Sequence, residues 1–386
     1  MPMHPDWLIL GAGLTGAALA YELQGRGQSV LLLDRHANVS GASRHSYGGV
    51  PDWAAVTPLQ RQWFAAGRTR LEALSRELPL DFDYRRRTLL LAVDAEDDPT
   101  ELMVQMAAFE RAPVWLEADA ARAEEPLLSG AIAGAFRIDH GQVEPAALVE
   151  AYRAGLVERG GQFQVANIER LLTDGRRVLG VRTQDGQDLQ AGQTVVAAGA
   201  DSKRLLHQLG VRLPLFHSQA DLLETEPTPL TLRTLVMGAR LRRFGLEARA
   251  AELNWDRPDP DWPDPILDPG ALQFRDGHLR LGQISALETI GHPLPSAAAS
   301  EAAIRAAIAR WLPALADLPA RWVRCPVSFS TDQRPFCGRV PDWERLALFC
   351  GFSSPFVLVP SLAAGFADAA CGGTPLPPEV SPARFS

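Results

Sequence analysis

The N-terminal part of the chain alternates between short apolar runs and one helical pattern. Residues 7–10 (WLIL) form the first apolar run, and residues 30–33 form the second. Between them, Ala17, Ala18, Tyr21 and Leu23 recur at the spacing of one helix face. The pattern predicts a strand, a helix and a second strand, which is the opening of an α/β sheet.

The same patterns continue along the chain. Helical spacing covers residues 58–78, 99–111, 145–160 and 301–311, and strand patterns cover 88–93, 163–166, 178–183, 194–198, 213–226 and 272–284. Three Asp-Gly pairs, at 174–175, 185–186 and 276–277, are typical of hairpin turns.

Two segments carry loop signals. Residues 40–51 are rich in Gly and Ser and predict a loop after the second strand. Residues 254–270 are rich in Pro and Asp, which excludes a helix interior or a central strand. We expect this second segment to be an exposed loop, with a lid over the site as the alternative.

The turn after the first strand carries a G-x-G-x-x-G pattern. Gly11 allows a tight turn, Gly13 lets a pyrophosphate approach the backbone, and Gly16 lets helix and strand pack closely. Asp34 ends the second strand about 20 residues on, where an acid binds the ribose. Strand, turn, helix and acid together predict dinucleotide binding, against a Gly-rich turn in another α/β protein.

Composition narrows the function further. The 386 residues are 46% hydrophobic and 22% charged, with a formal net charge of −8, so a nucleic-acid partner is not expected. No apolar stretch has the length of a membrane span, and the early fingerprint favours a cytoplasmic protein without a signal peptide. The four cysteines, Cys325, Cys337, Cys350 and Cys371, lack metal-site spacing, so no metal site is expected.

A second nucleotide-binding element lies late in the chain. The apolar run at 194–198 leads into Gly199 and a helix start at Asp201. This is compatible with any parallel strand of an α/β sheet. After the N-terminal fingerprint, it suggests a discontinuous cofactor domain that is completed by distant segments.

Several motifs resemble one family when they are taken in order. They are the fingerprint with Asp34, then 41–43 (GAS) with 48–49 (GG), 141–149 (GQVEPAALV), 198–200 (AGA), 276–282 (DGHLRLG), 331–338 (TDQRPFCG) and 350–353 (CGFS). The chain resembles the flavoproteins typified by D-amino-acid oxidase, glycine oxidase and monomeric sarcosine oxidase.

The resemblance implies FAD and an α/β (mixed α+β) fold. A discontinuous Rossmann-like FAD-binding domain would comprise residues 1–85, 140–215 and 320–386. An antiparallel-sheet substrate domain would comprise residues 86–139 and 216–319. The implied reaction oxidises a C–N bond of an amine or amino acid: a hydride passes to flavin N5, and the imine then hydrolyses.

The resemblance also assigns roles to individual residues. Arg280, His45 and Tyr47 are the implied catalytic residues. The implied cofactor-binding residues are Gly11, Gly13, Gly16, Asp34, Arg35, Ser43, Arg44, Val165, Gly199, Cys325, Gly351, Phe352, Ser353 and Ser354.

The chain departs from the family where a substrate carboxylate would bind. Val327 and Leu358 stand where relatives carry an arginine or a lysine. A buried carboxylate needs a charged partner, so either Arg44 or an arginine among residues 240–249 substitutes, or the substrate is an amine or modified amino acid. Ser354 is followed by Pro355 and Phe356, another departure from the family pattern.

Arg280 stands where sarcosine-oxidase relatives place a lysine that assists oxygen, so it either favours oxygen reduction or is a surface arginine. Cys325 and His45 stand where two branches of the family carry a covalent flavin link. We expect noncovalent FAD, with Cys325 the next candidate for a link.

Three functions remain open at this point. The first is a stand-alone FAD amine or amino-acid oxidoreductase, and the second is the flavin subunit of a heteromeric opine-type or cyanide-forming dehydrogenase, with an electron-transfer partner. The third, an NAD-dependent dehydrogenase, fits the late 198–199 element poorly.

Overall fold

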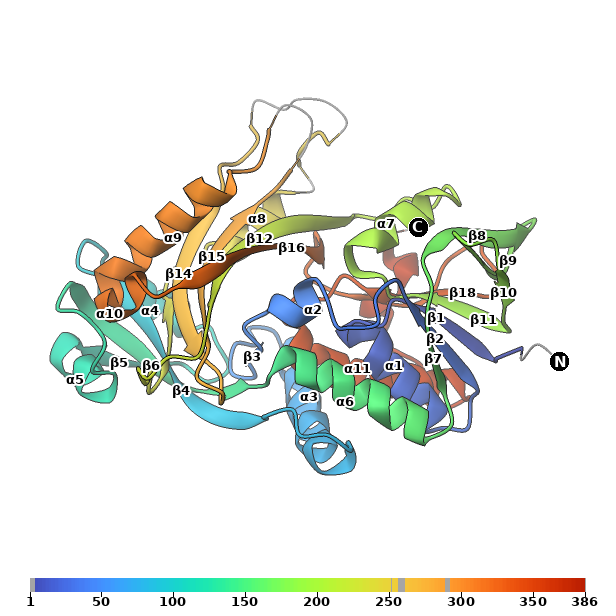
Figure 1. Ribbon diagram of the computed structural model, residues 1–386, viewed down its shortest axis with the longest axis horizontal. Helices are drawn as coiled ribbons and strands as arrows, with labels where there is room; N and C mark the ends of the chain where they lie inside the picture. The colour runs from blue at the N-terminus through green and yellow to red at the C-terminus, as the bar shows by residue number, and fades with distance from the viewer. Residues whose placement is uncertain (1–3, 251, 256–260, 289–291, 386) are drawn as a thin grey trace.

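The computed structural model describes residues 4–250, 252–255, 261–288 and 292–385. Two large sheets lie side by side, the six-stranded sheet on the right of Figure 1 and the nine-stranded sheet on the left. The predicted mixed α/β fold is confirmed. Among the described residues, no helix combines the length and apolar character of a membrane span.

The six-stranded sheet has the order β17-β18-β11-β1-β2-β7. Its strands are β1 (Trp7–Leu10), β2 (Val30–Asp34), β7 (Gln162–Val165), β11 (Gln193–Val196), β17 (Phe336–Arg339) and β18 (Leu346–Cys350). All neighbours are parallel except β17 and β18. The late strand β11 pairs directly with β1, so the sheet is assembled from distant segments as the late nucleotide element suggested.

Both faces of this sheet are covered, which is why its inner strands are apolar throughout. On one face lie α1 (Leu14–Gln24), α3 (Pro58–Glu77), α6 (Pro145–Glu158) and α11 (Pro355–Ala370) (Figure 1). The other face packs on α7 (Ser202–His207) and the small sheet of β8 (Ile168–Asp174), β9 (Arg177–Thr183) and β10 (Asp188–Gln190).

The nine-stranded sheet has the order β16-β12-β15-β14-β13-β4-β6-β3, with β5 on β6. Its strands are β3 (Gly49–Val50), β4 (Arg85–Asp94), β5 (Val114–Glu117), β6 (Ile132–Gln142), β12 (Leu215–Thr225), β13 (Leu235–Gly238), β14 (Ile266–Gln273), β15 (Leu279–Ala286) and β16 (Ala320–Ser330). Neighbours are antiparallel except β13 and β4. The predicted domain boundaries remain a prediction.

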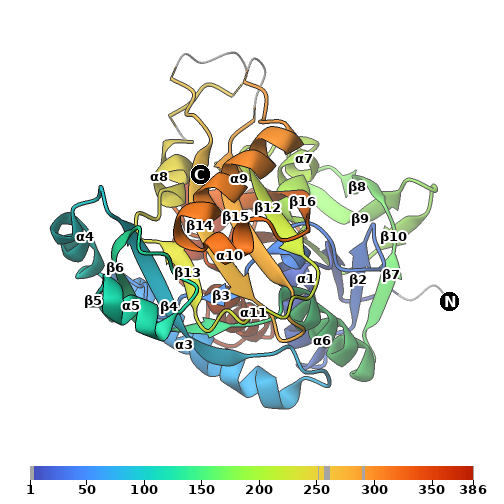
Figure 2. The ribbon, with the colours of Figure 1, turned by 60° about the vertical axis from the view of Figure 1, so that its left-hand side comes forward.

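Helices close the ends and one face of this sheet. Alternate residues of β4 enter different cores: Leu90 and Ala92 pack with α9 (Ala297–Trp311), and Leu89 and Leu91 pack on the opposite face. Figure 2 shows α9 and α10 (Pro313–Ala316) in front of the sheet. The shorter helices are α4 (Pro99–Met106), α5 (Ala118–Glu124) and α8 (Arg243–Arg249).

Two loop predictions need correction. Residues 40–51 contain a short helix, α2 (Ala42–His45), and the strand β3. The Pro-rich segment ends in a central strand, because β14 begins at Ile266. Pro269 is tolerated there because the pairing with β15 is irregular between Leu267 and Gly270, so its missing N–H falls at a bulge. Residues 256–260 of that segment lie outside the described residues.

Candidate functional site

The turn between β1 and α1 is built so tightly that side chains cannot enter it. Gly11 has φ +102°, and a Cβ there would lie 2.6 Å from the carbonyl oxygen of Ala197. A Cβ on Gly16 would lie 1.8 Å from the Gly11 carbonyl oxygen. The end of β11 therefore meets the turn directly, and Gly13 sits at the N-cap of α1, the end of a helix that favours an anion.

Asp34 fixes this turn through its carboxylate. Its Oδ2 accepts a hydrogen bond from the Ala12 amide at 2.7 Å, and its Oδ1 accepts one from the His36 amide at 3.0 Å. Val165 lies opposite Asp34 on β7 and is 51% exposed. Arg35 pairs with Asp201 at 2.6 Å, beside Gly199 in the turn that follows β11.

Arg153 is a residue of this turn that the sequence analysis missed. It projects from α6, and its Nε donates to the Ala12 carbonyl at 3.0 Å. Burial lowers the pKa of Arg153, although the negative charge of Asp34 raises it in part. Its only sequence signal is a charged residue on the buried face of an amphipathic helix.

Residues 41–49, which we call the bridging loop, connect the turn to the nine-stranded sheet. At one end, Ser43 Oγ accepts from the Leu14 amide at 3.0 Å, and a Cβ on Gly13 would lie 2.7 Å from that oxygen. At the other end, β3 pairs with β6. Arg44 is exposed to solvent. The loop is therefore fastened at both ends.

His45 and Tyr47 lie between these two attachments. His45 Nδ1 is 2.9 Å from Glu224 Oε1. The Tyr47 hydroxyl is buried and has no hydrogen-bond partner among the described residues. Burial raises the pKa of Tyr47, although the positive charge of Arg280 lowers it in part. This phenol therefore stays protonated and can donate a hydrogen bond.

Glu224 is the centre of a buried ionic cluster that the sequence analysis missed. Its Oε1 accepts from Arg280 Nε at 3.0 Å, and its Oε2 accepts from Arg321 Nη2 at 2.8 Å. Arg280 Nη1 also donates to the Ser46 carbonyl. The side chains of Glu224 and Arg280 are 13% and 5% exposed. The structure thus places Arg280 and His45 on one carboxylate.

The ionisation of the cluster follows from these contacts. Burial would raise the pKa of Glu224, but the hydrogen bond from His45 and the charge of Arg280 outweigh it and lower that pKa to about 2. Burial lowers the pKa of Arg280, while Glu224 and Glu144 oppose the change. At neutral pH the pair is therefore a carboxylate and a guanidinium.

Cys325 lies on β16 and is 3% exposed. Burial, with smaller contributions from Asp221 and Glu224, raises the pKa of its thiol to about 12. The thiol is therefore protonated at neutral pH, and a thiol is a poorer nucleophile than a thiolate.

The turn after β18 approaches the start of β12. Gly351 has φ +74°, and a Cβ there would lie 3.0 Å from Leu215 Cδ1. Ser354 takes a left-handed conformation, with φ +54°, just before α11. Ser353 Oγ is buried without a hydrogen-bond partner among the described residues. Phe352 is buried and packs on Phe349.

Leu358 and Val327, which stand where relatives carry a charged anchor for the substrate carboxylate, have different surroundings. Leu358 lies on α11 and is buried in the core that this helix shares with α1. Val327 is half-buried on β16, opposite Ser218. Neither position offers a charge.

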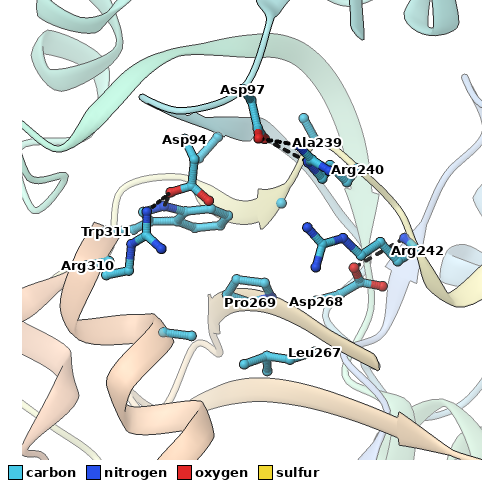
Figure 3. Close-up of a pocket in the computed structure, with 13 residues that line it drawn as sticks. Asp94, Asp97, Ala239, Arg240, Arg242, Leu267, Asp268, Pro269, Arg310 and Trp311 are labelled. Atoms are coloured by element: carbon cyan, nitrogen blue, oxygen red, sulfur yellow. Dashed lines mark hydrogen bonds and ion pairs between the residues drawn. The ribbon is translucent and has the colours of Figure 1, made fainter. Parts of the chain in front are cut away.

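A cavity of about 210 Å³ lies at the far end of the nine-stranded sheet (Figure 3). Arg240 pairs with Asp97 and Arg310 pairs with Asp94, while Asp268 accepts from the Arg242 and Arg243 amides. Ala92 and Trp311 line this cavity and belong to the core on the α9 face, whereas Tyr47 packs on the opposite face. Ala239 also lines the cavity and belongs to the core on which Tyr47 packs.

Comparison with known proteins identifies one matching family. The family described as FAD dependent oxidoreductase (DAO) matches residues 6–369. Glycine oxidase from Geobacillus kaustophilus superposes with a TM-score of 0.78 at 20% identity, covering 98% of both chains. This likeness shows the fold.

Two curated relatives are similar in sequence. The 4-methylaminobutanoate oxidase (formaldehyde-forming) of Paenarthrobacter nicotinovorans is 24% identical over 97% of this chain and 44% of the relative. The hydrogen cyanide synthase subunit HcnC of Pseudomonas aeruginosa is 26% identical over 59% of this chain and 66% of the relative. The chain therefore spans about half to two thirds of the length of these relatives.

Proposed function

Because the chain belongs to the family of FAD dependent oxidoreductases, we propose that it oxidises a C–N bond in an amine or modified amino acid. The observation that carries this proposal is the buried group of Arg280, His45 and Tyr47 at the bridging loop. These residues lie where a flavin that extends from the β1–α1 turn along the loop would present its ring.

The turn fits the cofactor in shape and chemistry. Gly11, Gly13 and Gly16 keep the turn compact, because a Cβ on any of them would meet atoms of the protein. A pyrophosphate would then bind at the N-terminus of α1, and Asp34 would contact the ribose beside Val165. The buried hydroxyls of Tyr47 and Ser353 lack partners among the described residues and would be satisfied by polar atoms of the ring. FAD supplies the hydride acceptor when it is bound.

The chain's own residues would handle the protons. With Nδ1 facing Glu224, the Nε2 atom of His45 is the one left to take a proton from a substrate ammonium. Tyr47 remains protonated and would orient the substrate through its hydroxyl. Arg280 holds the bridging loop through Ser46.

The substrate class follows from the missing carboxylate anchors. Val327 and Leu358 are apolar, and the charge of Arg280 is balanced by Glu224. Arg240 is paired with Asp97 at the cavity. A simple amino acid would therefore leave its carboxylate without a buried cation, which costs several kcal/mol, so a secondary amine with a distant or absent carboxylate is favoured.

Anaerobic bleaching of the flavin tests this function. The purified holoenzyme should lose its absorbance near about 450 nm, the band of oxidised flavin, when it is mixed with the right member of a panel of N-methyl amines and amino acids. Bleaching reports hydride transfer whatever the final electron acceptor is. A panel in which only NADH or an alcohol bleaches the flavin would refute the proposed C–N chemistry.

A second candidate is a flavin subunit of a heteromeric dehydrogenase. The similarity to hydrogen cyanide synthase subunit HcnC supports this alternative. Such a subunit would pass electrons to a partner protein. Co-purification of a second chain from the native source, lost after high-salt washing, would favour this candidate over a stand-alone enzyme.

A further inference from the structure

One carboxylate neutralises the cation of the candidate site. Glu224 on β12 lies directly opposite Arg280 on β15 in the strand register. Their side chains meet at 3.0 Å, with Oε1 shared by His45. Both side chains are largely buried, so water screens the pair weakly and the two charges cancel each other at close range.

The remaining contacts of Arg280 are also made to protein groups. Its Nη1 donates to the Ser46 carbonyl, and its Nη2 lies 3.8 Å from Glu144 Oε1. Its guanidinium lies over the ring of Phe274, 4.5 Å from the centroid. Arg321 is a second cation on Glu224, but its side chain is 67% exposed, so solvent screens its charge.

We propose that Glu224 is a positioning residue that holds Arg280 in a neutral ion pair and thereby keeps reaction of the reduced site with oxygen slow. The proposal rests on the proposed function only in that FAD lies beside the bridging loop. It implies that electrons leave for an acceptor other than oxygen.

The physical reason is the charge that develops during oxygen reduction. Dioxygen takes two electrons from reduced FAD and two protons, and leaves as hydrogen peroxide. Negative charge develops on oxygen as the electrons arrive, and an unpaired cation in a dry site stabilises that charge strongly. A guanidinium whose charge is cancelled by a carboxylate at 3.0 Å supplies much less stabilisation.

Glu224→Gln in the full-length holoenzyme tests the proposal directly. The variant keeps the side-chain shape but leaves Arg280 with a net charge. After anaerobic reduction with dithionite, its reoxidation by oxygenated buffer should be faster than that of the wild type by about tenfold or more. The midpoint potential of bound FAD should also shift to a more positive value.

Three controls separate the electrostatic role from a structural one. Glu224→Asp keeps the charge and should restore slow reoxidation and the original potential. The double variant Glu224→Gln/Arg280→Met lacks the cation and should also return both quantities towards the wild type. Glu344→Gln removes an exposed carboxylate that pairs with Arg177 and should change neither.

Several outcomes would overturn the proposal. Equal reoxidation rates in the wild type and Glu224→Gln would do so, as would equal midpoint potentials of bound FAD. If Glu224→Gln loses FAD, Arg280→Met is compared with the double variant: slower reoxidation in Arg280→Met, which leaves Glu224 with an uncompensated negative charge, supports the ion pair, and equal rates contradict it. Dithionite needs no amine, so these results stand even if the proposed substrate class fails.

Discussion

The β1–α1 turn contacts the bridging loop at Ser43, the Glu224 cluster contacts it at His45 and Ser46, and the two regions are built differently. The turn relies on glycines and backbone amides, and the Asp34 carboxylate accepts hydrogen bonds from two amides. The cluster relies on buried side-chain charges, with Glu224 holding His45 and Arg280. The turn is therefore sensitive to added volume, and the cluster is sensitive to the gain of one proton or the loss of one charge.

This difference separates two kinds of tolerance. A steric site fails once a side chain occupies its space, whatever the pH. A charge-pair site keeps its shape when one member is neutralised but loses the balance that its partner needs. The first three predictions below each challenge one site while leaving the other intact, and the fourth concerns the thiol of Cys325.

The largest effect is expected for Gly16→Ala. The new Cβ would lie 1.8 Å from the Gly11 carbonyl oxygen, which is backbone and cannot move aside. The variant should purify without FAD and lose about 2–3 kcal/mol of unfolding free energy in urea. Gly245→Ala is the matched control, since its Cβ would meet nothing within 4 Å. If Gly16→Ala purifies with its full FAD content, steric exclusion at this turn does not control FAD binding.

Acid should destabilise the cluster through Glu224. Its pKa is lowered from 4.5 to about 2 on folding, so its contribution is present above pH 4.5 and is lost as the pH falls towards 2. On the order of 2 kcal/mol of unfolding free energy should be lost over that window. In Glu224→Gln, the slope of stability against pH should be shallower there. Parallel slopes would show that Glu224 is not stabilised in the folded protein.

Asp34→Ala should weaken FAD binding by about 1–3 kcal/mol, the value of hydrogen bonds to a charged group. The variant also frees the amides of Ala12 and His36, so the turn loosens locally while the fold survives. Titration of the FAD-free protein with FAD measures the loss. Unchanged affinity together with an unchanged melting temperature would place the ribose elsewhere.

The smallest effect is expected for Cys325→Ser. Burial holds the pKa of this thiol near 12, which disfavours the thiolate that a covalent flavin link needs. Acid precipitation should therefore release FAD into the supernatant for the wild type and the variant alike. If wild-type flavin stays in the pellet, Cys325→Ser and His45→Ala compared in the same assay would identify the linking atom.

The parts of the site that could be predicted from sequence are those built from neighbouring residues. Gly11, Gly13 and Gly16 act through their own backbone, and Asp34 follows at a spacing set by one helix and two strands. Hydrophobic periodicity reveals such units because each buries one face. The element at residues 194–199 also suggested that a late segment completes the cofactor domain, and β11 does pair with β1.

Glu224 could not be found in this way, because its partners come from distant positions. His45, Arg280 and Arg321 lie 179, 56 and 97 positions away. The pairing of β12 with β15 and β16 brings Arg280 and Arg321 to Glu224, and α2 brings His45. The one sequence signal for Glu224 was an acidic residue within the largely apolar strand β12. The strand containing Pro269 was missed for a related reason: a bulge depends on the neighbouring strand.

The position of β16 at the end of the nine-stranded sheet has a consequence for self-association. An eleven-residue strand at a sheet edge offers a row of backbone groups on which another chain could align. Pro326 lacks an amide hydrogen at the middle of that edge, and the charged side chains of Arg321 and Arg324 precede it, paired with Glu224 and Asp221. These three residues would discourage two copies from joining edge to edge into a larger sheet, and Pro326→Val would make the protein more prone to aggregate.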